Sequence, residues 1–152
     1  MSDTSNSPAG RPVFPKRAVV TGGMPYGNKR LHLGHIGAVF IPADIFARFL
    51  RDRIGADKVI FVSGTDCYGS PIVEYHRRAV AAGTFSGDLE AFVRQNHEYQ
   101  KAELASYRIS NTLFGASALD RSGAIHQELS QEILATLHSN GWLRKNSTPQ
   151  FF

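Results

Sequence analysis

Cysteine is almost missing from this sequence, since Cys67 is the only one among 152 residues. A single thiol cannot form an intramolecular disulfide, which excludes a disulfide-stapled scaffold and a zinc site built on several cysteines. Long apolar stretches are also missing, because no run approaches the roughly 20 residues of a membrane-spanning helix. We therefore expect no membrane-embedded segment.

The N-terminal stretch MSDTSNSPAGRP lacks the apolar core of a secretory signal, so we expect a cytoplasmic protein. Residues 1–16 are rich in Ser, Pro, Gly and Asn, which is typical of a disordered leader. Acidic residues are outnumbered, with 13 Asp and Glu against 17 Lys and Arg. This balance suits a partner that carries phosphate, although ordinary surface charge explains it equally well.

The rest of the chain alternates short apolar runs with helical patterns. RAVVTGG (17–23), KVIFVSG (58–64) and ISNTLFG (109–115) read as strands. Helices are expected over about residues 34–53, 71–82, 88–107 and 122–139. Such an alternation predicts an α/β fold, with a Rossmann-like parallel sheet flanked by helices.

Two details of this fold can be predicted from the pattern of apolar residues. KVIFVSG is a continuous apolar run, typical of a strand that is covered on both faces. In the first helix, Pro42 removes a backbone donor and should cause a kink. The buried face of that helix is expected to carry Ile36, Val39, Phe40, Ala43, Phe46 and Leu50.

Two unusual loops follow the first two predicted strands, at residues 22–31 and 64–70. In parallel sheets, ligands bind beyond the carboxyl ends of the strands. The first loop leads through GGMPYGNKRLHLGHIG (22–37) into a helix, and it ends with His32 and His35, three residues apart. A ligand site is therefore predicted at this edge of the sheet.

Three explanations of the first loop fit it less well than phosphate binding at a helix N-terminus. A phosphate-binding loop of the Walker type is rejected, because Gly22 and Gly27 are followed by Asn-Lys-Arg and not by Gly-Lys-Ser/Thr. A metal pair at His32 and His35 has no obvious third ligand, so no metal site is expected. A purely structural role for each histidine is the third alternative.

Phosphate binding explains the pattern better. A helix N-terminus presents free N–H groups and a partial positive charge, to which imidazole N–H groups would add directed hydrogen bonds. Gly34, between the two histidines, would let a nucleotide approach the backbone closely. Such an arrangement could hold ATP and stabilise charge while the α-phosphorus is attacked.

The motifs resemble those of a known family. HLGH (32–35) resembles the His-Ile-Gly-His signature of class I aminoacyl-tRNA synthetases. MPYGNKRLHLGH (24–35), ADIFARFLR (43–51) and GTDCYGSPI (64–72) are most similar to the methionyl-tRNA synthetase family. The resemblance runs from about residue 17 to the C-terminus. It implies that residues 17–152 are the N-terminal part of the catalytic domain, the first half of its nucleotide-binding fold, cut short.

The resemblance also implies roles for individual residues. His32 and His35 would be catalytic, and Gly23, Tyr26, His32, Gly34 and His35 would bind ATP. Met24, Tyr26 and Asp66 would bind methionine, with the Asp66 carboxylate pairing with the α-ammonium group. A turn-forming Asp66 and a packing role for Tyr26 remain alternatives. Mg²⁺ is expected with ATP, and tRNA as a partner through domains outside this chain.

The sequence also departs from the family pattern. The second ATP signature, Lys-Met-Ser-Lys-Ser, is missing, and RKNST (144–148) is a poor echo of it. We therefore expect the 152-residue chain alone not to charge tRNA. Two other functions stay open. A small-substrate nucleotidylyltransferase also carries His-x-Gly-His but leaves the Gly-Thr-Asp loop unexplained, and a non-catalytic paralogue would explain the missing motifs.

Overall fold

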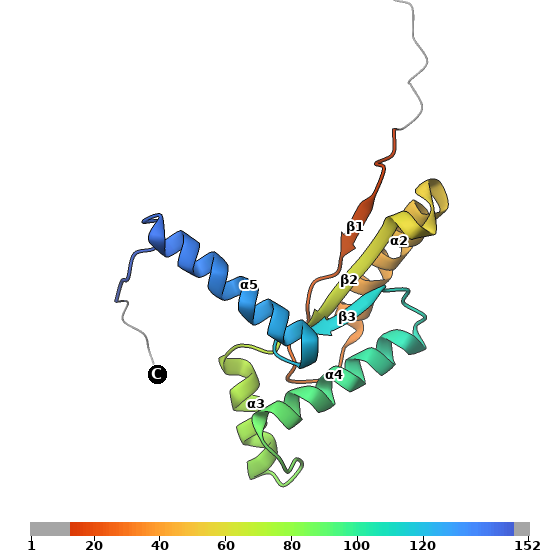
Figure 1. Cartoon of the computed structure of the whole chain (residues 1–152). Coiled ribbons are helices and arrows are strands. Elements are labelled where there is room, and N and C mark those ends of the chain that lie inside the picture. The colour runs from red at the N-terminus through yellow and green to blue at the C-terminus, as the bar shows by residue number, and fades with distance from the viewer. Residues whose placement is uncertain (1–12, 148–152) are drawn as a thin grey trace, which may run out of the picture.

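A computed structural model describes residues 13–147. The strands are β1 (Ala18–Thr21), β2 (Val59–Thr65) and β3 (Leu113–Ala116). The helices are α1 (Leu33–His35), α2 (Ile41–Ile54), α3 (Ser70–Ala81), α4 (Leu89–Ser106) and α5 (Asp120–Ser139), with a π-helical turn η1 (Ile36–Phe40) and a 3-10 turn η2 (Ala56–Lys58). Both strand pairs are parallel, in the order β1-β2-β3 (Figure 1). The predicted α/β fold is confirmed.

The core lies between one face of the sheet and helices α2 and α4. Phe40 and Phe61 are fully buried there, with Leu50 and Leu104 almost so. A second, smaller cluster joins α3 and α4 to the end of β3 through Ile72, Val93, Ala116 and Leu119. Asp88 accepts a hydrogen bond from the Ala91 N–H and so caps α4.

The π-helical turn changes which residues of the first long helix are buried. In η1 the Ile41 N–H donates to the Ile36 carbonyl, so the chain gains one residue before Pro42. Pro42 then stands in the first turn of α2, where its missing N–H costs little. The extra residue rotates the side chains of α2 about the helix axis relative to a continuous α-helix. The predicted burial of Phe46 is wrong, since it is 53% exposed while Asp44 and Ala47 are buried.

The second face of the sheet is partly open, which makes the predicted two-sided cover of β2 wrong at Ile60. Its side chain is 47% exposed, beside Val19 on β1. The physical reason is the direction of α5, which contacts the sheet at β3 near its own start and then projects away as an arm (Figure 1). Gly123 is the one buried residue of α5.

The continuous helical segment Leu33–Ile54 is long and apolar enough to cross a membrane by length and composition alone. The predicted lack of such a stretch therefore needs correction. We assign this segment as the core helix of the domain, because Ile36, Phe40, Ala47 and Leu50 pack in the same cluster as strand residues Val20 and Phe61.

The predicted leader falls mostly outside the described residues. Residues 13–17 form no regular secondary structure, and Phe14 packs against Phe49 of α2 with ring centroids 5.9 Å apart. Disorder of residues 1–16 stays a prediction.

Candidate active site

The two histidines cap the helix that follows the first loop. His32 is the N-cap of α1, and its Nδ1 accepts a hydrogen bond from the Gly34 N–H at 3.1 Å. In return, Nδ1 of His35 accepts from the His32 N–H at 3.2 Å. This reciprocal pattern is a capping box, which Ser or Thr usually forms with Glu or Gln. Both imidazoles are therefore fixed by the backbone that carries them.

The capping box determines where each imidazole carries its proton. An Nδ1 atom that accepts an N–H cannot itself be protonated, so the hydrogen of each neutral ring is on Nε2. The ring centroids lie 3.8 Å apart, with the planes inclined by 32°. Burial, followed by the charges of His32 and Lys29, lowers the pKa of His35 below its usual 6.5. The site thus presents the Nε2–H groups of two neighbouring rings as donors.

The position of the His32 ring favours glycine at position 34. A Cβ atom at this position would lie 3.0 Å from Cε1 and Nδ1 of His32. The absence of a side chain at Gly34 therefore gives the His32 ring room to reach the backbone. This adds a second reason for the glycine to the predicted close approach of a nucleotide.

The other predicted site residues lie on the two loops at the carboxyl ends of β1 and β2. Tyr26 and Asp66 form an isolated parallel β-bridge, in which the Asp66 N–H donates to the Pro25 carbonyl at 2.8 Å. The Gly27 N–H donates to the Asp66 carbonyl at 2.7 Å. The structure thus brings Tyr26 and Asp66 together, and the Tyr26 side chain is 49% exposed.

Gly23 and Met24 both follow the end of β1 and have different neighbours. A Cβ at Gly23 would lie 3.8 Å from Val39, one helical turn beyond His35. Met24 lines a small cavity of about 160 Å³ beside Gly64, together with Ser122 and His126 of α5. Gly23 is thus near the histidine helix, and Met24 is near the strand end that leads to Asp66.

Asp66 partly fits the alternative role of a turn-forming residue. One carboxylate oxygen accepts a hydrogen bond from the Tyr68 N–H at 3.1 Å, which is the pattern of an Asx turn. The other oxygen makes no hydrogen bond to the described residues, and the residue is half-buried. Asp66 therefore shapes its turn and still offers an acceptor to a ligand.

The sequence reasoning missed a buried polar network on α4. Gln100 is fully buried, and its Nε2 donates to the carbonyls of Tyr26 and Lys29. Its Oε1 accepts from the Thr65 hydroxyl, which also contacts Nδ1 of the buried His97. The signal was available, because three polar residues (Asn96, His97 and Gln100) fall at helical spacing on the inward face of α4.

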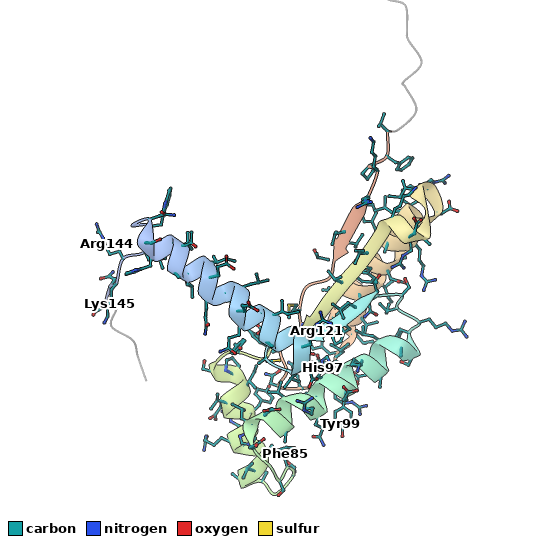
Figure 2. All side chains as sticks on the ribbon, in the orientation of Figure 1. Phe85, His97, Tyr99, Arg121, Arg144 and Lys145 are labelled. Atoms are coloured by element: carbon teal, nitrogen blue, oxygen red, sulfur yellow. The ribbon has the colours of Figure 1, made fainter. Side chains whose placement is uncertain are left out.

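Arg144 and Lys145, which belong to the segment that weakly resembles the second ATP signature, are not near this site. Arg144 and Lys145 lie at the far end of α5, on the arm that projects away from the sheet (Figure 2). They therefore cannot contribute to the site in this arrangement.

The next feature is the distribution of side chains that could bind a metal ion. No group of three or more His, Cys, Asp or Glu side chains among residues 13–147 could hold a metal ion. Asn28, in the first loop, has a buried Oδ1 without a hydrogen-bond partner in the described chain. Asn28 Oδ1 is therefore an acceptor for which residues 13–147 supply no donor.

Comparison with known proteins agrees with this geometry. The family model of "tRNA synthetases class I (M)" matches residues 18–152. The methionine–tRNA ligase of Pyrococcus abyssi is 36% identical over 136 residues, which is 90% of this chain and 17% of that protein. The Methanococcus maripaludis enzyme is 37% identical over 134 residues, 88% of this chain and 18% of its own length. The chain therefore spans less than a fifth of these relatives.

Solved structures give the same result. The crystal structure of Mycobacterium tuberculosis methionyl-tRNA synthetase bound by methionyl-adenylate superposes with a TM-score of 0.68 and 29% sequence identity. The match covers 82% of this chain and 22% of that one. With a family model that matches nearly all of the described residues, the chain belongs to the class I tRNA synthetases of the M type.

Proposed function

We propose that this chain supplies the ATP-binding and methionine-binding loops of a methionine–tRNA ligase. The observation that carries the proposal is the capping box, which leaves the Nε2–H groups of His32 and His35 as donors beside a glycine-rich loop. Support comes from the relatives, which are named methionine–tRNA ligases, and from the structural neighbour bound by methionyl-adenylate.

In the proposed reaction, a carboxylate oxygen of methionine attacks the α-phosphorus of ATP. The new P–O bond gives methionyl-adenylate, and the bond to the β-phosphate breaks and releases pyrophosphate. The His32 and His35 donors would stabilise negative charge on the phosphate oxygens as it develops in the transition state. A hydroxyl of the tRNA's terminal ribose then attacks the methionyl carbonyl, and AMP leaves.

The loop residues would orient the two substrates. Gly23 and Gly34 would border the nucleotide, with Tyr26 between the nucleotide and the amino acid. Met24 would border the methionine side chain, and the free Asp66 oxygen would pair with the α-ammonium group. A neutral imidazole suits this task, because it can donate a hydrogen bond from Nε2 while Nδ1 accepts one from the backbone.

Mg²⁺ and tRNA enter the proposal through the substrate and the rest of the family architecture. Mg²⁺ usually binds through nucleotide phosphates and few protein groups, which fits a site without a metal cluster among residues 13–147. Contacts to tRNA would come from regions beyond the fifth of the relatives that this chain matches. The proposed location is the cytoplasm, and we expect the 152-residue chain alone not to charge tRNA.

The test is ATP–pyrophosphate exchange on the longest available form of the protein, with each amino acid supplied in turn. We expect exchange with methionine and little with the others. Exchange driven by another amino acid and not by methionine would contradict the specificity. Adenylylation of a small phosphorylated substrate without any amino acid would favour the nucleotidylyltransferase alternative.

A further inference from the structure

The loop that carries Tyr26 and leads to His32 is held from one side by two residues of α4. Gln100 donates from its Nε2 to the Tyr26 carbonyl and to the Lys29 carbonyl, both at 2.9 Å. Glu103 accepts from the Leu31 N–H at 2.8 Å through Oε2. Gln100 and Glu103 are three residues apart and so lie on the same face of α4.

The Gln100 side chain has one hydrogen-bond assignment that satisfies every partner. Both Nε2 hydrogens go to backbone carbonyls, so Oε1 must accept from the Thr65 hydroxyl at 2.7 Å. The Thr65 oxygen, having used its only hydrogen, then accepts from Nδ1 of His97 at 2.8 Å. The side chains of Gln100, Thr65 and His97 are buried and paired, and the network links the first loop to the end of β2 directly before Asp66.

Glu103 acts at the other end of the loop. Its Oε1 also forms an ion pair with Arg30 at 2.8 Å, and the Arg30 guanidinium lies over the Tyr99 ring, 4.7 Å from its centroid. Leu31 immediately precedes His32, whose N–H donates to His35 Nδ1. A displacement of the Leu31 backbone would therefore move the donor on which the capping box depends.

We propose that Gln100 and Glu103 are positioning residues that fix the loop Tyr26–Leu31 and thereby set the orientation and tautomers of the His32 and His35 rings. Neither residue forms a hydrogen bond with either ring, so their effect on the rings passes through the backbone of the loop. Gln100 holds the amino-acid end of the loop at Tyr26, and Glu103 holds the histidine end at Leu31. For its kinetic consequences, the inference rests on the proposed function; for the ring tautomers it does not.

The same helix offers matched controls. Gln95 and Glu98 are exposed residues of α4 with the same side-chain types. The test variants are Gln100→Leu and Glu103→Leu, and the controls are Gln95→Leu and Glu98→Leu. Glu103→Gln is a rescue variant, because its amide oxygen can still accept from the Leu31 N–H while the charge facing Arg30 is removed.

The first readout is ¹⁵N NMR of histidine-labelled 152-residue chain at pH 7.5, which distinguishes protonated from unprotonated ring nitrogens. In the parent chain we expect His32 and His35 to be protonated on Nε2 alone. Glu103→Leu and Gln100→Leu should give averaged tautomers, whereas Glu103→Gln and both controls should keep the parent pattern. In Glu103→Leu, an unchanged His97 signal shows that the fold is retained.

The second readout is methionine-dependent pyrophosphate exchange on the longest form. Glu103→Leu should lower kcat on the order of 10- to 100-fold with the methionine KM little changed, since small misplacements of a catalytic group have costs of this size. Gln100→Leu should also raise the methionine KM, because it releases Tyr26.

The outcomes separate the two proposals. A parent enzyme without methionine-dependent exchange contradicts the proposed function, and the ring tautomers then decide this inference alone. A parent enzyme that exchanges, with both variants keeping parent kinetics and parent tautomers, overturns the inference. Controls that shift as much as the test variants also overturn it.

Discussion

A histidine pair can act as a capping box because imidazole has two different nitrogens. Nδ1 lies close enough to the main chain to replace the carboxylate or hydroxyl of the usual motif, and Nε2 points away from it. Each ring thus binds the helix backbone with one nitrogen and leaves the other nitrogen for a ligand. This dual use explains how His32 and His35 can be structural and chemical at once.

The lowered pKa of His35 has a measurable consequence for stability. Burial, with the His32 and Lys29 charges, favours the neutral ring in the folded state. The stability linked to His35 is therefore fully present above pH 6.5, the usual pKa of histidine, and is lost as the pH falls through the lower folded pKa. Urea unfolding of the parent chain and His35→Asn between pH 5 and 7.5 measures this.

We expect the parent chain to lose stability relative to His35→Asn as the pH falls below 6.5. Parallel pH profiles for the two proteins would show that the ring does not titrate with folding.

Asp66→Asn tests the amino-acid end of the site. The amide keeps an oxygen for the Tyr68 N–H, so the turn should survive, but the charge opposite the α-ammonium is lost. We expect the methionine KM to rise about 10- to 100-fold, the loss of a charge-assisted hydrogen bond, with ATP affinity nearly unchanged. Equal losses for ATP and methionine would instead indicate that the whole loop had moved.

At the scale of elements, Asp44 is the buried charge that joins α2 to the segment before β3. Its carboxylate accepts from the Ser110 N–H and from Arg48 Nε, both at 2.7 Å. Burial raises the Asp44 pKa, but the hydrogen bonds from Ser110 and Arg48 outweigh it and lower the pKa below 3.8. Asp44 should therefore remain ionised at neutral pH.

Asp44→Ala should lower the free energy of unfolding by about 2–3 kcal/mol at pH 7, the usual loss for hydrogen bonds to a charged group. Asp52→Ala, exposed on the same helix, is the control and should change stability by less than about 0.5 kcal/mol. The Asp44 contribution is present above pH 3.8 and is lost as the pH falls through the folded pKa. Equal effects of the two substitutions would contradict this assignment.

The elements themselves could be predicted from periodicity and turn chemistry. Asp88, Gly64 and the apolar runs before each loop define the ends of α4 and β2 within a residue or two. The π-helical turn could not be predicted, because no feature of the sequence other than Pro42 indicates the added residue. That single residue moved Phe46 out of the core and Asp44 into it.

The place of the candidate site was predictable from the two loops, since His32 and Asp66 do follow the carboxyl ends of β1 and β2, whereas their roles stay predictions. The supporting network was not predicted, because Gln100 acts through backbone carbonyls far along the chain. The helical spacing of Asn96, His97 and Gln100 indicates an inward polar face of α4, but it does not identify the partners of Gln100, which are 71 and 74 residues away.

For the whole molecule, the open sheet face has consequences for behaviour in solution. Strand register places Val19, Ile60 and Leu113 on the same face, and these side chains are 66%, 47% and 55% exposed. The α5 arm adds an apolar row of Leu129, Ile133 and Leu137. Contiguous apolar surface of this kind favours association.

We expect the isolated 152-residue chain to self-associate as its concentration rises. Replacing Val19, Ile60 and Leu113 together with Thr should increase the monomer fraction in light scattering, because threonine favours strands and adds a polar group. Val80→Thr, exposed on α3, should have no effect. A parent chain that stays monomeric at high concentration would contradict the prediction.

The central claim is that His35 acts on phosphate and not merely in the fold. Its most direct test is methionine-dependent pyrophosphate exchange by the longest form carrying His35→Asn, with the exposed His138→Asn on α5 as the matched control. Asparagine can accept from the His32 N–H and still offers one N–H donor, so the thermal midpoint should hardly change. We predict that the exchange rate falls roughly 100-fold or more while the methionine KM stays unchanged. A loss of several kcal/mol in stability (large for one substitution), with unchanged turnover per folded molecule, would show that His35 is a core residue and that the phosphate role is wrong.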